Sequence, residues 1–329
     1  MLTNTLPVIE RLCCRSISYA RQVVKKYDYE NYLCTLLLPP PRQNFAFALR
    51  AFNVELAQIR DRVQNVEQAR FRFQFWKDVV EELFNSQMKY HTALERELKE
   101  SALGIRLSKY HFHKLISARE MHFNECAFDT LESALVYAEA TNTSIHYLLC
   151  EAYGLRSLAV DHTLSHLGRA QGLVYLLRGA VPLARRRRTI LLPLDLLSKH
   201  HVTQESVLRL LRSDQSASCP ATAADNSLCD VFHDIASVAH RHAIKAVKLG
   251  EEACTGKNAR ETEAAADSLT RTLLPRLLLP LIPISDYLDR LAEQGNFDPR
   301  KVDERVSGTL PFRLSWSAWR NVIPSGPRT

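Results

Sequence analysis

The sequence predicts an all-α fold that forms one large domain. Apolar residues recur at helical spacing along most of the chain, and signals for strands are nearly absent. The chain has 329 residues, of which 46% are apolar and only 10 are glycine, so it can bury a large core. A chain of this length that is helical throughout favours one domain over two.

The first 26 residues have the composition of a mitochondrial transit peptide. They contain five basic residues against one acid, Glu10, together with serines and scattered apolar residues. Such an acid-poor, amphipathic segment is typical of mitochondrial import, and it lacks the long apolar centre of a secretory signal. The alternative is a first helix with a basic face. We therefore predict a transit peptide over 1–26 and a single all-α domain over 27–329.

Helical periodicity predicts the elements of the first half in order. Residues 27–38 lead into prolines at 39–41, which end any helix there, and a second helix is expected over 45–61. Three phenylalanines alternate over 71–75 as in a strand, but the longer pattern through residue 84 is helical. Further helices are expected over 91–99, 108–124 and 130–153, the last of which ends at Gly154.

The stretch 162–197 combines small residues with a run of basic ones. Gly168, Ala170 and Gly172 lie within an apolar helical pattern and allow close approach of either another backbone or a ligand. Pro182 is predicted to close this helix. Four arginines follow it, and a second short helix is expected to begin at 191–193.

The remaining chain is also predicted to be helical. Residues 213–227 lack periodicity and are expected to form a loop, which is followed by a long helix over 228–250. A loop over 251–266 leads into the next helix. Spaced prolines in 272–283 predict a kinked, buried helix that continues to residue 294. An aromatic helix that ends at residue 320 is expected to cap the core.

The order of motifs in 162–197 resembles the squalene/phytoene synthase family. The motifs are Leu-Gly-x-Ala-x-x-Leu from Leu167, a Leu-Leu-Arg step that ends at Arg178, a basic loop, and Leu-Pro-x-Asp-Leu-Leu from Leu192. Active members join two prenyl diphosphates head to head. The resemblance covers about residues 29–320 and implies the helical bundle of the isoprenoid synthases.

The chain departs from this family at both aspartate-rich motifs. Active members carry Arg-Asp-x-x-x-Asp to hold magnesium against diphosphate, and the two aspartate positions here are Gly179 and Leu183. The first motif has two aspartates four residues apart, and the corresponding region offers Glu55 followed by Ile59. Glycine, leucine and isoleucine side chains supply no oxygen ligands for magnesium. The departure implies a pseudoenzyme with no catalytic residues, no metal and no cofactor.

Residues 47–57 resemble one branch of the family in particular, whose members assist the assembly of mitochondrial respiratory complex I. The resemblance implies a non-catalytic matrix protein that is peripheral to the inner membrane, with complex I subunits or assembly intermediates as its partners. Two alternatives remain open. One is a magnesium-dependent prenyl transferase that uses Glu55, Asp61 and Asp195 as replacement metal ligands, and the other is a carrier of a lipid or isoprenoid.

Composition limits the other classes of function. The formal charge of +7 is modest for this length, so charge does not imply a nucleic acid partner. No run of 18 or more uncharged apolar residues predicts a membrane-spanning helix. The eight cysteines show no metal-binding spacing, which favours ordinary thiols in a reducing compartment.

A residual pocket is expected between the helices, because a bundle built for two prenyl chains keeps a cavity unless large side chains fill it. Its candidate residues are Asn53, Glu55, Gln171, Tyr175 and Arg178. A simple ion pair between Glu55 and a neighbouring arginine is the alternative for that residue.

The candidate anion-binding residues are four consecutive arginines, Arg185, Arg186, Arg187 and Arg188. The resemblance places them where the synthases handle diphosphate, beside the missing aspartates. Without the motif aspartates and with four arginines beside them, this region favours an anion that carries no magnesium, such as a lipid phosphate or an acidic protein surface. A solvated loop without a ligand is the alternative.

Two pairs of histidines are candidate metal ligands. His162 and His166 lie four apart and share a helical face, but no third ligand is evident, so a structural pair is favoured. His240 and His242 lie two apart and cannot share a face. The sequence therefore predicts no metal site.

Overall fold

The computed structural model describes residues 18–63, 65–85, 89–124, 127–213, 223–255, 264–302 and 305–328. These ranges contain helices, turns and one isolated bridge between Phe128 and Pro193, and no strand occurs within them. The prediction of an all-α fold is confirmed.

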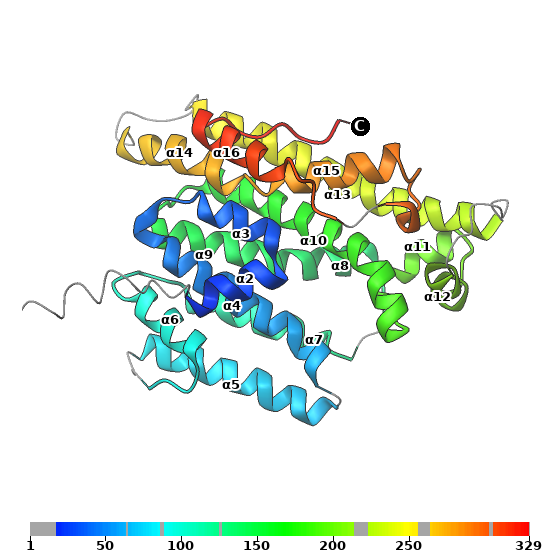
Figure 1. Cartoon of the computed structure of the whole chain (residues 1–329), viewed down its shortest axis with the longest axis horizontal. Coiled ribbons are helices and arrows are strands. Elements are labelled where there is room, and N and C mark those ends of the chain that lie inside the picture. Colours follow the sequence, from blue (N-terminus) through cyan, green and yellow to red (C-terminus); the bar gives the residue numbers. More distant parts are fainter. Residues whose placement is uncertain are drawn as a thin grey trace, which may run out of the picture.

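The α-helices in chain order are α2 (Tyr19–Tyr27), α3 (Tyr29–Leu36), α4 (Pro40–Arg62), α5 (Val66–Phe84), α6 (Ala93–Ala102), α7 (Lys109–Met121), α8 (Leu131–Ala138), α9 (Ser144–Tyr153), α10 (Leu158–Arg187), α11 (Leu194–Lys199), α12 (Gln204–Arg212), α13 (Ala223–Thr255), α14 (Ala264–Leu277), α15 (Leu281–Glu293) and α16 (Leu310–Arg320). A π-helical turn, η1 (Glu139–Thr143), joins α8 to α9, and a short 3-10 turn, η3 (Pro299–Lys301), precedes α16. Figure 1 shows α10 in the middle of the bundle, with α13 to α16 on one side and α4 to α6 on the other.

Helix α10 continues through Pro182, so the prediction that this proline closes the helix is wrong. A proline removes one backbone hydrogen bond from a helix interior. Ala180, Val181 and Ala184 are nonetheless buried around it, and their packing holds the last turn in place. Three of the four consecutive arginines are therefore helical, and the helix ends where Arg188 takes a left-handed conformation with φ of 55°.

Two of the glycines of α10, Gly168 and Gly172, allow close packing against η1 and the end of α8. A Cβ atom at position 168 would lie 2.1 Å from Thr143 Oγ1, and one at position 172 would lie 2.3 Å from Ala138 Cβ. The interpretation as close packing of backbones therefore holds for both positions. Gly172 also lines the cavity described below.

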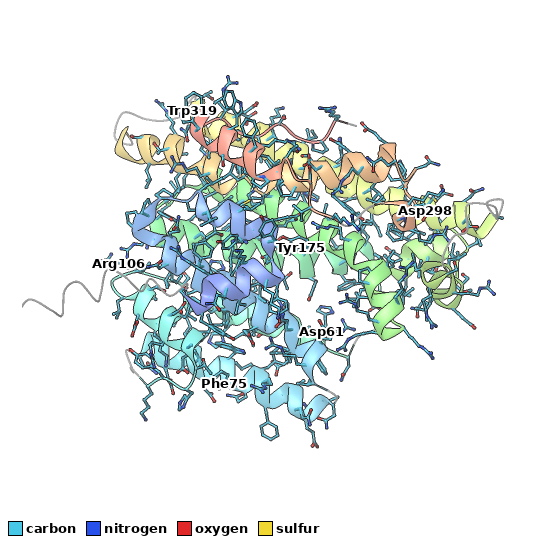
Figure 2. The ribbon with its side chains drawn as sticks, viewed as in Figure 1. Asp61, Phe75, Arg106, Tyr175, Asp298 and Trp319 are labelled. Carbon is cyan, nitrogen blue, oxygen red and sulfur yellow. The ribbon has the colours of Figure 1, made fainter. Side chains whose placement is uncertain are left out.

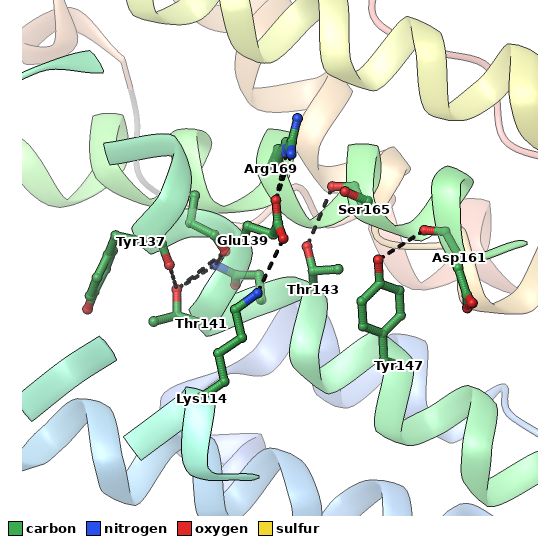
Figure 3. A network of polar contacts seen from close by, with 11 residues as sticks. Lys114, Tyr137, Glu139, Thr141, Thr143, Tyr147, Asp161, Ser165 and Arg169 are labelled. Carbon is green, nitrogen blue, oxygen red and sulfur yellow. Dashed lines mark hydrogen bonds and ion pairs between the residues drawn. The ribbon is translucent and has the colours of Figure 1, made fainter. Parts of the chain in front are cut away.

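Polar contacts tie η1 to the helices on either side of it, as Figure 3 shows. Glu139 of η1 forms ion pairs with Arg169 of α10 at 2.7 Å and with Lys114 of α7 at 3.3 Å. Thr143 Oγ1 donates to the carbonyl of Ser165 on α10 at 3.5 Å. The π turn inserts an extra residue into the helical path, and these contacts hold it against α10.

The N-terminal helix α2 belongs to the core, although all its residues but Tyr27 fall within the predicted transit peptide. Ala20, Val23 and Val24 are buried. The backbone amides of Tyr19 and Ala20 donate to the carboxylate of Glu97 on α6, at 2.8 and 3.1 Å. Residues 1–17 of the predicted segment lie outside the described residues.

The C-terminal elements follow the predicted pattern with three differences, one of which is that α13 runs to Thr255 and α14 begins at Ala264, both within the predicted loop over 251–266. The chain turns at residues 278–280 between α14 and α15, where a kinked helix was expected, and α13 begins at Ala223, earlier than predicted. Residues 214–222 of the predicted loop lie outside the described part of the chain. Helix α16 covers an apolar cluster through Leu310 and Leu314, whereas Trp319 is 77% exposed and points away from the bundle (Figure 2).

Candidate functional site

A cavity of about 640 Å³ lies between α3, α4, α5, α7, α8 and α10. This volume is in the usual range for small-molecule sites. Its lining consists of Tyr27, Asp28, Tyr29, Glu30, Asn53, Val54, Leu56, Ala57, Gln58, Arg60, Asp61, Phe73, Arg119, His122, Phe123, Phe128, Ala134, Tyr137, Thr141, Asn142, Gly172, Tyr175, Leu176, Arg178, Leu183, Leu191 and Val306. Three of the five predicted pocket residues, Asn53, Tyr175 and Arg178, are among them.

The face that α4 turns to the cavity differs from the predicted one. Asn53, Ala57 and Asp61 line the cavity at intervals of four residues, which is the spacing of one helical face. Glu55 lies roughly 200° around the helix from Asn53, and its carboxylate instead pairs with Arg62 at 2.7 Å. Ile59 is buried in the core. Glu55 therefore does not line the cavity, contrary to the prediction, and the acid that α4 presents there is Asp61.

Helix α10 forms the opposite wall. Tyr175, Arg178 and Leu183 line the cavity, and the Arg178 guanidinium pairs with Glu30 of α3 at 2.6 Å. Gly179 is not part of the lining. A Cβ atom at Gly179 would meet only Leu183 Cδ1, at 3.7 Å, so there is room for a side chain at this position.

Gln171 lies behind the cavity wall rather than in it. Its Nε2 donates to the hydroxyl of Tyr175 at 2.8 Å and to Asn31 Oδ1 at 3.2 Å. Its Oε1 contacts His146 Nε2 at 3.0 Å. Burial lowers the pKa of His146 to about 3 and raises the pKa of Tyr175, so both stay neutral near neutral pH. The network fixes the orientation of Tyr175 at the cavity.

The cavity residues do not fit a magnesium cluster. The positions that face it from the two motif regions carry Ala57 and Leu183, and Gly179 has no side chain. Asp61, the one acid among them, pairs with Arg187 at 3.0 Å. Within the described ranges no group of three or more His, Cys, Asp or Glu side chains is placed to hold a metal ion. Magnesium requires several oxygen ligands, which this wall lacks.

The four arginines lie at the C-terminal end of α10, and all are exposed. Arg187 is one helical turn beyond Leu183 and reaches across to Asp61 on α4, so its charge is partly neutralised. Arg185 also has a partner. Binding of an anion by this run stays a prediction.

Asp195 has a structural role that excludes it as a metal ligand at the cavity. Its carboxylate accepts hydrogen bonds from the Leu131 amide, at 3.0 and 3.2 Å, where α8 begins. It also accepts from the Leu196 amide at 2.8 Å. A carboxylate at the N-terminus of a helix satisfies free amides and complements the helix dipole.

His166 pairs with a residue that the sequence did not suggest. Its Nδ1 lies 2.7 Å from Nδ1 of His242 on α13, and His162 is exposed. Burial, together with nearby Lys245 and Arg169, lowers the pKa of both His166 and His242 to about 4.

We expect this histidine pair to make stability depend on acid pH. The folded chain keeps both rings neutral down to about pH 4, whereas in the unfolded chain they bind protons below their ordinary pKa of 6.5. The free energy of unfolding should therefore fall as pH falls from 6.5 to about 4. In His242→Phe this dependence should be shallower, as measured by urea unfolding across that range. The exposed His162→Phe is the control, and equal slopes in all three proteins would contradict the expectation.

Sequence reasoning missed several cavity residues, above all Arg119 of α7. Its guanidinium donates to Asn53 Oδ1 at 2.5 Å and to the Leu115 carbonyl at 3.2 Å. Residues 53 and 119 are far apart in the chain, and no spacing pattern connects them. An arginine in the last turn of a helix also has an ordinary explanation in the helix dipole.

Comparisons with known proteins find relatives over most of the chain. A profile of the family described as squalene/phytoene synthase matches residues 24–320. Curated relatives are named "NADH dehydrogenase (ubiquinone) complex I, assembly factor 6". The protein of Bos taurus is 35% identical over 303 residues, which cover 92% of this chain and 81% of the relative. The protein of Mus musculus is 38% identical over 92% of this chain and 81% of the relative. The Drosophila melanogaster homolog is 35% identical over 92% of this chain and 83% of the relative.

Solved structures show the same fold. A crystal structure of a dehydrosqualene synthase in complex with ligand superposes with a TM-score of 0.68 at 15% identity, over 92% of this chain and 94% of that chain. Squalene synthase HpnC from Alicyclobacillus acidocaldarius superposes with a TM-score of 0.60 at 13% identity, over 84% of this chain and 92% of that chain. The prediction of an isoprenoid-synthase-like helical bundle is confirmed.

Proposed function

We propose a function for this chain from the premise that it belongs to the squalene/phytoene synthase family. Within that family it is a non-catalytic member that assists the assembly of mitochondrial respiratory complex I. The observation that carries this proposal is its likeness to relatives named complex I assembly factor 6, which extends over 92% of the chain in mammals and an insect.

The residues that line the cavity support the proposal that the chain is non-catalytic. At the motif positions it presents Ala57 and Leu183, and Asp61 is engaged by Arg187. The prenyl transferase alternative needs Glu55 and Asp195 at the cavity, but Glu55 pairs with Arg62 and Asp195 caps α8. These contacts disfavour that alternative.

The proposed partners are complex I subunits or assembly intermediates, and the proposed location is the mitochondrial matrix at the inner membrane. No helix among the described residues is long and apolar enough to span a bilayer, so the membrane contact we propose is peripheral. Because α2 packs into the core, we place the end of the proposed transit peptide before Tyr19 rather than at residue 26.

Asp61→Asn separates the two classes of function. It removes the one acid at the cavity-facing motif positions but keeps the shape of the side chain. In cells that lack this protein, we expect the wild-type chain and Asp61→Asn to restore the amount of assembled complex I equally, as measured by native gel electrophoresis. The physical reason is that a protein that binds a subunit does not need this carboxylate to hold magnesium.

The same two proteins, purified and supplied with magnesium and farnesyl or geranylgeranyl diphosphate, should give no prenyl product. Formation of a product that is lost in Asp61→Asn would overturn the non-catalytic assignment. Normal amounts of complex I in cells without the protein would overturn the assembly role.

A further inference from the structure

We infer that the cavity binds, without any metal ion, an amphiphile with one oxyanion head and one hydrocarbon chain, and that Arg119 holds the head. This assigns a ligand class and a recognition residue that the assembly role does not require. The inference depends on the charge balance of the cavity and on the composition of its walls.

Arg119 is a cavity-lining cation that has no carboxylate partner among the described residues. Three acids line the cavity: Glu30 binds Arg178, Asp61 binds Arg187, and the Asp28 carboxylate accepts two hydrogen bonds from Asn31 Nδ2, at 2.8 and 3.0 Å. Burial raises the pKa of Asp28, because removal of water disfavours its charged form. In the part of the chain that the structure describes, no carboxylate lies within ion-pair distance of Arg119, and its guanidinium donates hydrogen bonds to neutral oxygens of Asn53 and Leu115.

Arg119 is partly buried, and a charge is costly to remove from water even in part. Burial lowers the pKa of Arg119, because removal of water disfavours the charged form. A guanidinium nevertheless keeps its proton near neutral pH, so the charge stays. An arginine away from water is stabilised chiefly by an anion, and its planar fork fits a carboxylate or a phosphate through two parallel hydrogen bonds. The cavity thus has a place for one anionic group that the chain itself does not supply.

The walls beside Arg119 suit a hydrocarbon chain. His122, Phe128 and Tyr137 contact one another, with ring centroids 5.1 to 5.4 Å apart, and all three line the cavity. Phe73 and Phe123 form a second ring pair at 6.2 Å on the same lining. Four leucines, Val54 and Val306 add aliphatic side chains to the lining. A cation beside an aromatic and aliphatic wall matches an amphiphile rather than a small polar anion.

One unpaired cation indicates one oxyanion. The head is therefore a carboxylate or a phosphate monoester, held by a guanidinium instead of by metal-bridged carboxylates, which the cavity lacks. A fatty acid and a prenyl monophosphate share this chemistry. A volume of about 640 Å³ accommodates a single chain of either kind.

The test measures binding of fluorescently labelled palmitate to the full chain in the presence of EDTA, with unlabelled farnesyl monophosphate as competitor. We expect saturable binding by the wild-type protein, and an affinity lower by about 10- to 100-fold in Arg119→Met, because a charged hydrogen-bond donor is lost. Arg119→Lys should fall between the two, since a lysine keeps the charge but not the planar fork. Displacement by the monophosphate alone, or by unlabelled palmitate alone, identifies the preferred head.

Arg106→Met is the matched control. Arg106 is exposed and lies at the left edge of Figure 2, outside the cavity lining, so its loss should leave the affinity unchanged. Thermal unfolding of each variant shows whether it is folded. Three outcomes would overturn the inference: no binding of either probe to the wild-type chain, binding that requires magnesium, or equal affinity in Arg119→Met and wild type. A lower unfolding temperature in Arg119→Met with unchanged affinity would show that Arg119 only links α7 to α4.

Discussion

Replacement of Gly168 by alanine should lower the free energy of unfolding by about 3 kcal/mol, although it adds a single methyl group. The added Cβ would lie 2.1 Å from Thr143 Oγ1, 2.7 Å from Thr143 N and 2.8 Å from Thr143 Cα. A change of rotamer relieves only the first contact, because the other two atoms belong to the backbone. Either η1 or α10 must therefore move.

The same movement should reach the cavity. Thr141 and Asn142 of η1 and Gly172 of α10 line it, and Glu139 ties the two elements together through Arg169. A shift between η1 and α10 would change the wall that these residues form. We therefore expect Gly168→Ala to lower the affinity for labelled palmitate as well as the free energy of unfolding.

Gly179→Ala is the control within the same helix. Its Cβ would meet only Leu183 Cδ1 at 3.7 Å, an ordinary contact. Alanine favours a helix interior over glycine by about 1 kcal/mol, so this variant should be slightly more stable than the wild type. Urea unfolding followed by circular dichroism measures both changes. Equal stabilities of the two variants would show that the close approach at Thr143 does not constrain α10.

The sequence was sufficient for those features that depend on spacing within one element. Helical periodicity predicted the all-α fold, because an apolar stripe in a helix repeats regardless of what covers it. The positions of Gly179 and Leu183 followed from the fixed distance to Arg178 along one helix. Their lack of oxygen ligands could be read directly, since it is a property of the residue types.

Which face of α4 meets the cavity could not be predicted from the sequence. Most residues from Phe45 to Leu56 are buried, so this helix is apolar nearly all round and periodicity does not mark the face that meets the cavity. Glu55 and Asp61 were both acids at a plausible place, and only the packing of α4 against α5, α7 and α9 decides between them.

Features that depend on contacts between elements were also beyond the sequence. The π turn at 139–143 shifts the helical register, and nothing in Glu-Ala-Thr-Asn-Thr signals it without α10 beside it. A proline such as Pro182 usually ends a helix, but strong packing on both sides of it can keep the helix continuous. Arg119 and Asn53 meet because α7 crosses α4, which local pattern does not encode.

Introduction of aspartate at Ala57, Gly179 and Leu183 together should create a magnesium site where the wild-type chain has none. Ala57 and Leu183 line the cavity from opposite walls, Asp61 is one turn beyond Ala57, and position 179 has room for a side chain. Three of the four carboxylates would stand at cavity-lining positions, and the fourth, at 179, would lie one helical turn before position 183 on the same face of α10. Carboxylates supply the oxygen ligands that magnesium prefers. We expect magnesium to stabilise this variant by about 2 to 3 kcal/mol at about 100 times its dissociation constant, and to leave the wild type unchanged.

The matched control carries asparagine at the same three positions, which keeps size and shape but removes charge. Without magnesium the aspartate variant should be less stable than the asparagine variant, because its carboxylates repel one another. Addition of magnesium should reverse that order in thermal unfolding. If the order reverses, this cavity lacks a metal site only because its carboxylate ligands were lost. The Asp61–Arg187 ion pair then stands where the metal site would be. If magnesium has no effect on the aspartate variant, the walls themselves have moved apart, and the change from the synthases extends to the backbone of α4 or α10.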